Sequence, residues 1–208
     1  RNPATQANVS TLRACGIRFV MPQTGLLACG DVGEGKLAEV ADIAAAALDA
    51  LAPAPQDMAG ARVVITAGPT HEAIDPVRYI ANASTGKMGY AIAREAARRG
   101  AAVTLVSGPV SLTTPQGVDV VPVVSAAQMR DAALTAFEGA DAAICAAAVA
   151  DYTPAAPSGR KLKKGTDDLS TLRLVKTADI LAELSRSKGN RVVVGFAAET
   201  NDLLANAR

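Results

Sequence analysis

The sequence predicts an α/β protein in which a Rossmann-like parallel sheet, with helices on both faces, is preceded by a small partial α/β segment. Strand-like and helical stretches alternate along most of the chain, which is the pattern of βαβ units. Half of the residues (50%) are hydrophobic but only 3% are aromatic. The core must therefore consist of Ala, Val, Leu and Ile, which suits helices packed on a parallel sheet. A length of 208 residues is enough for one such domain and an appendage.

The amino-terminal part is expected to hold three short stretches and an Ala-rich helix. They are a polar helix at residues 5–13, a strand at 17–21, a glycine-rich loop at 25–35 and the helix at 42–51. Pro53 and Pro55 then interrupt the pattern and predict a linker. The predicted organisation is a first segment at 1–52, a linker at 53–60 and a domain at 61–208.

From residue 61 the pattern predicts a parallel sheet. The expected strands are 62–66, 102–107, 119–124, 141–149 and 191–197, and the expected helices are 88–99, 125–139 and 178–187. Ser125 and Gln128 form a capping-box pattern, and Gly100 stands where a helix needs its C-terminal cap. Glu95 and Arg99 have the spacing of an i,i+4 ion pair.

Ligands of such sheets bind at the carboxyl ends of the strands. Three of these ends carry unusual sequence, at Gly68 and beyond, at residues 146–152 and at residues 196–201. We expect the functional site there.

Composition and charge exclude several classes of protein. Twenty-one basic and 20 acidic residues give a formal charge of +1, so neither a nucleic-acid nor a membrane partner is expected. No apolar run reaches membrane-spanning length, and the start lacks a signal-peptide pattern. Because the chain begins at Arg1 without a Met, we expect it to be a fragment.

The cysteines indicate the redox compartment and argue against zinc. Cys15, Cys29 and Cys145 are an odd, widely spaced set with no CxxC pair, which is typical of reduced thiols in a cytoplasmic protein. We expect no metal ligands among the protein's residues, and any metal should be a hard ion such as Mg²⁺ that arrives with a nucleotide.

The loop from Gly68 to Gly89 is the first candidate site. It reads GPTHEAIDPVRYIANASTGKMG, follows a strand and ends in a helix whose first amides can bind an anion. It is neither a GxGxxG fingerprint nor a Walker P-loop, because its glycines are in other places. The alternative is a long connector with a solvated Lys87, but loops of this length inside a compact domain are usually functional.

The second candidate is the strand end AAAVAD at residues 146–151, followed by Tyr152 and the lysine run KLKK at 161–164. Small residues let a ligand's ring lie close to the backbone, and a carboxylate accepts hydrogen bonds from a sugar hydroxyl or an amino group. The lysines are either a solvated face or a flap of cations that closes over a triphosphate.

The third candidate is the helix start at Thr177, Ala178, Asp179 and Ile180. Free amides at a helix start, with Lys176 just before them, make a phosphate site. The alternative is an ordinary N-capped helix.

Together these motifs, with GFAAET at 195–200, resemble the phosphopantothenate–cysteine ligase domain of the bacterial bifunctional coenzyme A enzyme. The resemblance covers residue 61 to the end. Upstream, NPATQANV and ACGDVGEGK are similar to the end of its partner domain, the FMN-dependent phosphopantothenoylcysteine decarboxylase.

The resemblance implies a CTP-dependent reaction. The carboxylate of 4′-phosphopantothenate attacks the α-phosphate of CTP, which gives an acyl-cytidylate and pyrophosphate, and the amine of cysteine then displaces CMP. It also implies Mg²⁺ with the nucleotide, FMN in the full-length enzyme, and a homo-oligomer in that form.

The resemblance also implies roles for individual residues. Lys161 would stabilise charge during acyl-cytidylate formation, Asn82 would act on that intermediate, and Arg78 and Lys87 would hold the phosphate of pantothenate. The implied CTP contacts are Cys145, Ala146, Ala147, Asp151, Lys161, Ala178, Asp179, Ile180, Leu181 and Phe196.

In the first segment, Cys29 matches the decarboxylase cysteine that protonates the enethiolate intermediate, whereas Cys15 and Cys145 are expected to be buried, inert thiols. Lys36 and Leu37 stand where the family usually has Arg-Met, and His71 receives no role.

Two other interpretations remain. One is a nucleotide-binding fragment that turns nothing over because both domains are incomplete. The other is an NAD(P)-dependent oxidoreductase, which the missing glycine fingerprint disfavours.

Overall fold

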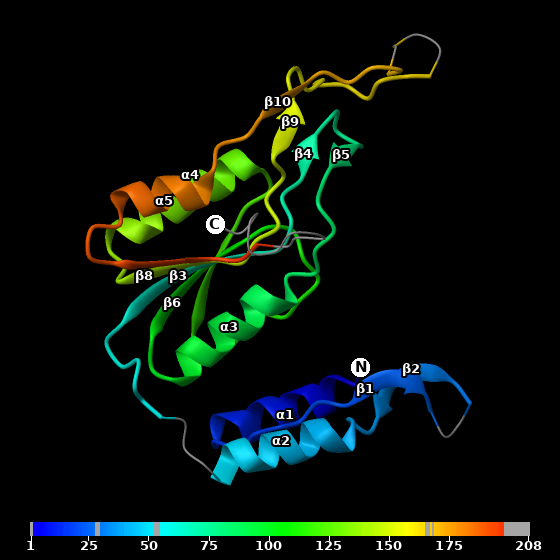
Figure 1. The fold of residues 1–208 in the computed structure, drawn as a ribbon. Coiled ribbons are helices and arrows are strands. Elements are labelled where there is room, and N and C mark those ends of the chain that lie inside the picture. The colour runs from blue at the N-terminus through cyan, green and yellow to red at the C-terminus, as the bar shows by residue number, and fades with distance from the viewer. Residues whose placement is uncertain (1, 28–29, 52–54, 165–166, 168, 198–208) are drawn as a thin grey trace. The chain divides into compact units, whose positions relative to one another are not determined.

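The computed structural model describes residues 2–27, 30–51, 55–164, 167 and 169–197. The chain forms two compact units, Arg1–Ala54 and Pro55–Arg208 (Figure 1). In the described residues, no helix is both long enough and apolar enough to span a membrane.

The first unit consists of two helices and a hairpin. Helices α1 (Pro3–Ala14) and α2 (Val40–Leu51) flank the antiparallel pair β1 (Gln23–Leu26) and β2 (Val32–Lys36). The predicted strand at residues 17–21 is wrong, because these residues form neither helix nor strand. Strand pairing occurs instead inside the predicted glycine-rich loop, where each short strand has an adjacent partner to bond.

The first unit has almost no core of its own. Ala38 is the one buried residue among those described there, and neither helix buries a side chain. Many of its large apolar side chains are exposed, and Leu26, Val32, Leu37 and Leu51 are each at least 70% accessible. A segment that buries so little apolar surface has little to hold it folded by itself.

The second unit contains the predicted parallel sheet. Its strands lie in the order β11-β8-β3-β6-β7, and every neighbouring pair is parallel. The strands are β3 (Arg62–Ala67), β6 (Ala102–Ser107), β7 (Val118–Pro122), β8 (Ala142–Cys145) and β11 (Val192–Gly195). The bounds of β6 match the prediction, and those of the other strands lie within two residues of it, apart from β8, which ends four residues early.

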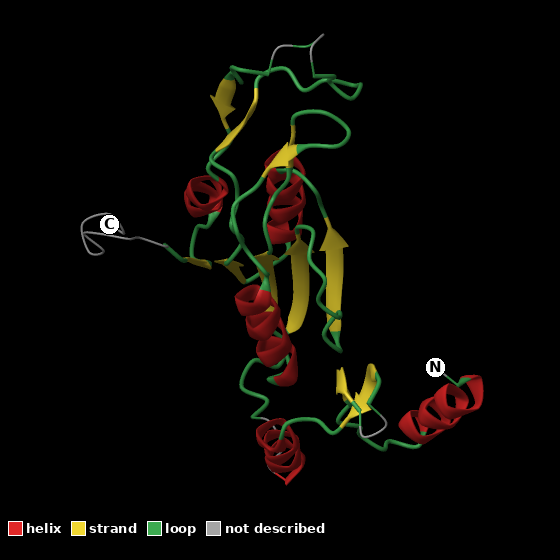
Figure 2. Ribbon diagram, turned by 90° about the vertical axis from the view of Figure 1, so that its right-hand side faces the viewer, coloured by secondary structure: helices red, strands yellow, loops and turns green. Residues whose placement is uncertain are grey.

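Helices cover both faces of this sheet, as predicted (Figures 1 and 2). Side chains of β3 alternate between the faces, so Val63 and Ile65 pack in one core cluster and Val64 in the other. The first cluster includes side chains of α3 (Lys87–Arg98). The second includes side chains of α4 (Ala126–Glu138) and α5 (Ile180–Ser187).

Of the features predicted at the helix ends, some are confirmed and others are wrong. The capping box of Ser125 and Gln128 is formed, and Gly100 has a φ of +93° just beyond α3. The predicted Glu95–Arg99 pair is wrong, because Glu95 binds Arg98 and Arg99 instead forms a two-bond pair with Asp57. Helix α5 begins two residues later than predicted because Asp179 is its N-cap and accepts from the Ala182 amide at 2.8 Å.

Two short antiparallel pairs form an arm beyond the carboxyl ends of the sheet strands (Figure 2). They are β4 (Glu72–Ala73) with β5 (Tyr79–Ile80), and β9 (Tyr152–Pro154) with β10 (Leu174–Lys176). The sequence did not predict them, because strands of two or three residues carry no periodic signal. The arm is made from the two long loops that carry the sequence motifs.

The packing of α5 generates the first prediction. Leu184 is fully buried between α4, α5 and the sheet. Replacing it with alanine should lower the free energy of unfolding by about 2–5 kcal/mol, because the substitution leaves a cavity. Chemical denaturation measures this, and the matched control Leu174→Ala, at a leucine that is 41% exposed, should cost about 0.5 kcal/mol or less. Equal losses in the two variants would contradict the assigned core.

Candidate functional site

The direction in which the chain adds strands to the sheet reverses between β3 and β8. From the central β3 the chain adds β6 and β7 on one side, then crosses to add β8 and β11 on the other. A reversal of strand order opens a crevice at the carboxyl ends of the two strands, which is where such sheets bind ligands. A pocket of about 1040 Å³ lies there and includes Thr66 near the end of β3 and Cys145 at the end of β8.

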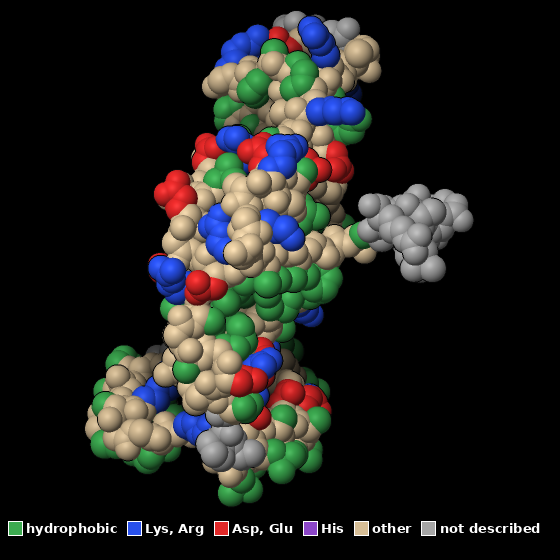
Figure 3. Space-filling model, turned by 60° about the vertical axis from the view of Figure 1, so that its left-hand side comes forward, with side chains coloured by type: hydrophobic (Ala, Val, Ile, Leu, Met, Phe, Trp, Pro, Cys, Tyr) green, Lys and Arg blue, Asp and Glu red, His purple; other side chains and the backbone are tan. Residues whose placement is uncertain are grey.

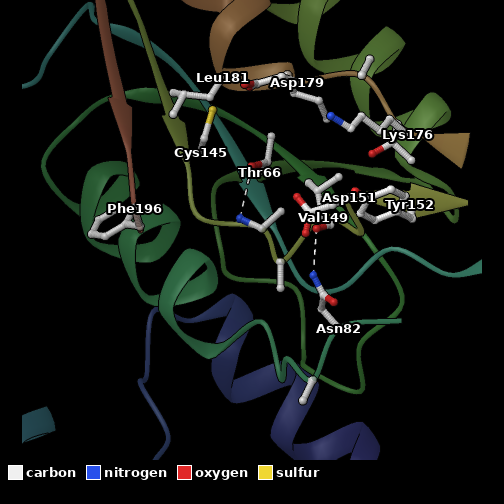
Figure 4. Close-up of a pocket in the computed structure, with 16 residues that line it drawn as sticks. Thr66, Asn82, Cys145, Val149, Asp151, Tyr152, Lys176, Asp179, Leu181 and Phe196 are labelled. Carbon is white, nitrogen blue, oxygen red and sulfur yellow. Dashed lines mark hydrogen bonds between the residues drawn. The ribbon is translucent and has the colours of Figure 1, made fainter. Parts of the chain in front are cut away.

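The pocket collects residues from five segments of the chain (Figure 4). Nine of the predicted site residues line it, namely Asn82, Cys145, Ala147, Asp151, Ala178, Asp179, Ile180, Leu181 and Phe196. It therefore lies at the carboxyl edge of the sheet, where the strand-end rule predicted a site.

Small residues whose amides are already bonded form one wall of the pocket. The amides of Ala146 and Ala148 donate to the carbonyl oxygens of Thr66 and Gly68 at 3.1 and 2.9 Å. The Ala147 amide donates to the Thr66 hydroxyl at 3.3 Å. These bonds fix the backbone after β8 beside the continuation of β3. A flat ligand can approach this wall closely because the side chains are methyl groups.

Asn82 enters the pocket from the loop before α3. Its Nδ2 donates to the Val149 carbonyl oxygen at 2.9 Å, which joins this loop to the segment after β8 (Figure 4). The bond fixes the orientation of the amide group and leaves its oxygen available as an acceptor.

The start of α5 is tied to the same segment. The Thr177 amide donates to the Asp151 carbonyl oxygen at 2.9 Å, and the Thr177 hydroxyl donates to the Ala150 carbonyl oxygen at 2.6 Å. The carboxylate of Asp179 caps the helix, so negative charge already lies at its positive end. The predicted phosphate site at this helix start thus shares its amides with a carboxylate.

Among the described residues that line the pocket, Lys176 is the only lysine or arginine. It ends β10 and pairs with Tyr152 of β9. The resemblance assigned no individual role to Lys176 or to the other lining residues Thr66, Ala83, Ala148, Val149, Tyr152 and Thr177, although residues 146–152 and the helix start with Lys176 and Thr177 were candidate sites. Most of them adjoin residues that were predicted, so the motifs pointed to the right segments.

The thiol of Cys145 is uncharged at neutral pH. Burial, and to a smaller extent the negative charge of Asp179, raise its pKa to about 11, against a hydrogen bond with Thr66 that lowers it. A neutral thiol is a weak nucleophile, so Cys145 forms part of the pocket wall and does not act as a nucleophile. Cys15 is exposed, which makes the expectation of a buried thiol wrong there.

Four predicted residues lie outside the pocket lining. Ala146 lies between two lining residues, Lys87 is the first residue of α3, and Lys161 is exposed on the segment between β9 and β10. Arg78 donates from Nε and Nη2 to Asp75 and from Nη2 to the Leu162 carbonyl oxygen. Cys29 lies outside the described residues.

Lysine and arginine side chains are prominent on the arm, over the segment that joins β9 to β10 (Figure 3). The pocket below it includes the carboxylates of Asp151 and Asp179. In the part of the chain that the structure describes, no three His, Cys, Asp or Glu side chains come together as metal ligands.

Comparison with known proteins identifies relatives of the whole chain. The chain is 49% identical to the coenzyme A biosynthesis bifunctional protein CoaBC of Bacillus subtilis (strain 168), over 100% of this chain and 51% of that protein. It is 45% identical to the protein of the same name from Mycobacterium bovis (strain ATCC BAA-935 / AF2122/97), over 97% and 50%. The chain thus spans about half the length of these curated relatives.

Solved structures resemble the second unit. A crystal structure of the C-terminal domain of CoaBC is 43% identical, with a TM-score of 0.63, and the match covers 72% of this chain and 70% of that one. A Cab2 variant in complex with phosphopantothenate-cysteine is 18% identical with a TM-score of 0.56, over 69% and 66%, and shares the fold alone.

The match to a protein family covers most of the chain. Residues 58–208 match the DNA/pantothenate metabolism flavoprotein C-terminal domain. This range contains the parallel sheet, the arm and every residue that lines the pocket. The chain therefore belongs to the family of the DNA/pantothenate metabolism flavoprotein C-terminal domain.

Proposed function

We propose that this chain is the ligase part of a bifunctional coenzyme A enzyme, preceded by the end of its decarboxylase. Residues 61–208 would catalyse the CTP-dependent joining of 4′-phosphopantothenate to cysteine. Residues 1–52 would belong to the FMN-dependent decarboxylase, and residues 53–60 would link the two. Relatives named coenzyme A biosynthesis bifunctional protein CoaBC match this chain over all of its length, which supports both assignments.

One observation supports this proposal more than any other. Of the residues that the resemblance assigns to CTP and to the intermediate, all but Ala146 and Lys161 line one pocket, and they come from four separate stretches, at 82, 145–151, 178–181 and 196. A chance resemblance of short motifs would not bring these stretches to the same edge of a sheet.

The polarity of the pocket suggests how a cytidine nucleotide binds. The methyl wall at Ala147 and Ala148 suits the flat base or the ribose, and Phe196 offers a ring nearby. Asp151 and Asp179 would accept hydrogen bonds from hydroxyl or amino groups. The phosphates should lie toward Lys176, because Asp179 already places a carboxylate at the start of α5.

The reaction proceeds in two displacements. A carboxylate oxygen of 4′-phosphopantothenate forms a bond with the α-phosphorus of CTP, and the bond from that phosphorus to pyrophosphate breaks. The amine nitrogen of cysteine then attacks the acyl carbon and loses a proton, and CMP leaves with the electron pair of the acyl–oxygen bond. The protein's task is to hold the reacting groups in place and to compensate phosphate charge.

Lys161 and Asn82 have separate tasks in this proposal. The ammonium group of Lys161 would approach the phosphates and stabilise the charge that develops in the first displacement. Asn82 would use its amide group to hold the acyl carbonyl for the second displacement. Arg78 and Lys87 would contact the phosphate of pantothenate. Arg78 would do so through Nη1, because its bonds to Asp75 and Leu162 use only Nε and Nη2.

Cofactors follow from the same proposal. Mg²⁺ would enter on the phosphates of CTP, because the described residues form no cluster of metal ligands of their own. FMN would serve the decarboxylase of the full-length protein, and the described part of residues 1–52 buries too little surface to hold it alone. A homo-oligomer of the full-length form is supported by the exposed apolar side chains of the arm, among them Val77, Tyr79 and Leu174.

Two alternatives predict different binding and turnover. A fragment that binds nucleotide without catalysis would bind CTP but release no pyrophosphate in the presence of 4′-phosphopantothenate and cysteine. An NAD(P)-dependent oxidoreductase would bind NADPH under conditions in which CTP does not bind.

Pyrophosphate release tests the role of Lys161. In the full-length enzyme, Lys161→Gln should reduce release by about 100-fold or more, because the charge in the first displacement loses its partner. Lys188→Gln, at an exposed lysine that follows α5, is the matched control and should release pyrophosphate at the parent rate. Parent-rate release by the Lys161 variant would show that the assigned role is wrong.

The role of Asn82 is tested by separating the two displacements. Asn82→Asp should slow transfer to cysteine by about 10-fold or more, while acyl-cytidylate formation, measured as pyrophosphate released without cysteine, changes less. The physical reason is that the carboxylate cannot donate a hydrogen bond to the acyl carbonyl. An equal loss in both steps would indicate a structural role through the bond to Val149 instead.

A further inference from the structure

Asp75 is a buried carboxylate in the turn between β4 and β5. Its side chain is 0% exposed, although the turn itself lies on the arm. Its Oδ1 accepts from the amides of Val77 and Arg78, both at 2.9 Å. Its Oδ2 accepts from Nε and Nη2 of Arg78 at 3.0 and 2.5 Å. The Arg78 guanidinium and these amides hold the pKa of Asp75 well below its ordinary value.

The same carboxylate reaches across the arm to the lysine-bearing segment. Its Oδ2 also accepts from the Leu162 amide at 3.1 Å, and Nη2 of Arg78 donates to the Leu162 carbonyl oxygen at 2.9 Å. The N–H and the C=O of Leu162 are thus both bonded to the Asp75–Arg78 ion pair, which lies 84 or more residues earlier in the chain. The Ser158 amide adds a bond to the Ile74 carbonyl oxygen at 2.9 Å.

The segment is also folded on itself. Asp167 accepts two bonds from the guanidinium of Arg160, at 3.0 and 2.6 Å, and one from the Lys163 amide at 2.7 Å. These bonds bring together the residues on both sides of Lys161. The side chain of Lys161 is exposed, and no hydrogen bond or ion pair to another described residue holds its ammonium group. Its backbone is therefore fixed while its charge remains available.

We propose that Asp75, with Arg78 as its partner, is a positioning residue that anchors residues 158–163 to the β4–β5 turn, so that Lys161 is held where it can reach the nucleotide's phosphates. This inference rests on the proposed function of Lys161. The ordering of this segment happens on folding, so its entropic cost is not incurred again when the nucleotide binds. A carboxylate is required because it alone can accept from the guanidinium and three amides at once.

The test compares two aspartates that each bind an arginine through two bonds. Asp75→Asn replaces one Oδ with an NH₂ group that cannot accept from Arg78 and Leu162. Asp57→Asn disrupts the pair of Asp57 with Arg99, which lies beside α3, and serves as the matched control. Trypsin cleavage reports on the anchor independently of catalytic activity. When the segment is no longer held to the β4–β5 turn, the lysines at 161–164 should be cleaved faster. We expect cleavage there to accelerate about 10-fold or more in Asp75→Asn and to stay at the parent rate in Asp57→Asn, in full-length proteins of parent melting temperature.

Pyrophosphate release then shows whether the anchor acts through Lys161. Asp75→Asn should reduce release by about 10-fold or more in the parent background and by less than about 2-fold in the Lys161→Gln background, since the two changes remove one function. Parent-rate cleavage by trypsin, or losses that multiply in the double variant, would overturn the inference. Parent-rate release by Lys161→Gln would instead contradict the proposed function, and trypsin would still report on the anchor.

A second variant covers the case in which Asp75→Asn does not fold. Leu162→Pro removes the amide hydrogen that Oδ2 of Asp75 accepts and leaves the side chains of Asp75 and Arg78 unchanged. Because trypsin does not cut a bond that precedes proline, cleavage is followed after Lys163 and Lys164. It should accelerate there, and an unchanged rate would count against the anchor.

Discussion

The reversal of strand order beside β3 is the constraint on which the site depends. Because β6 and β8 pair with opposite edges of β3, the loops after β3 and β8 leave the sheet next to each other without a strand between them. The Ala146 and Ala147 amides then bond to Thr66 and fix the small-residue wall. The segment that leads into α5 is bonded to this wall through Thr177, whose hydroxyl donates to the Ala150 carbonyl oxygen. The sheet and the segment after β8 therefore position the start of α5 at the pocket.

Charge is distributed unevenly around this pocket, and the arm accounts for the unevenness. Among the described residues, the pocket lining has two carboxylates and one lysine, whereas the segment between β9 and β10 carries Arg160 and the lysines at 161–164. A triphosphate needs more positive charge than the pocket supplies alone. In the proposed function the arm supplies part of this charge, and the bonds of the buried Asp75 and the partly exposed Arg78 to Leu162 hold the lysine-bearing segment against the β4–β5 turn.

Much of the sheet and part of the site could be predicted from sequence. Buried strands, the Ser125 capping box and the glycine after α3 follow from local patterns that do not depend on distant partners. The β9–β10 pair could not be predicted, because three residues carry no periodicity and the partner strand is 20 residues away. For the same reason the bonds between Asp75 and Leu162 leave no signal in the sequence. The sequence pointed to Lys176 beside the helix start, but it did not predict the pairing of Lys176 with Tyr152.

In the proposed function, CTP binds in the crevice between β3 and β8. The most direct measurement is a calorimetric titration of CTP into the full-length parent protein and into Ala147→Leu, which fills the small-residue wall with an isobutyl group. We expect one CTP site per chain in the parent and binding at least about 10-fold weaker in the variant, a difference of about 1.4 kcal/mol. ATP titrated in the same way reports the selectivity of the site. Equally tight CTP binding in parent and variant, or no CTP binding by the parent, would show that this crevice is not the CTP site.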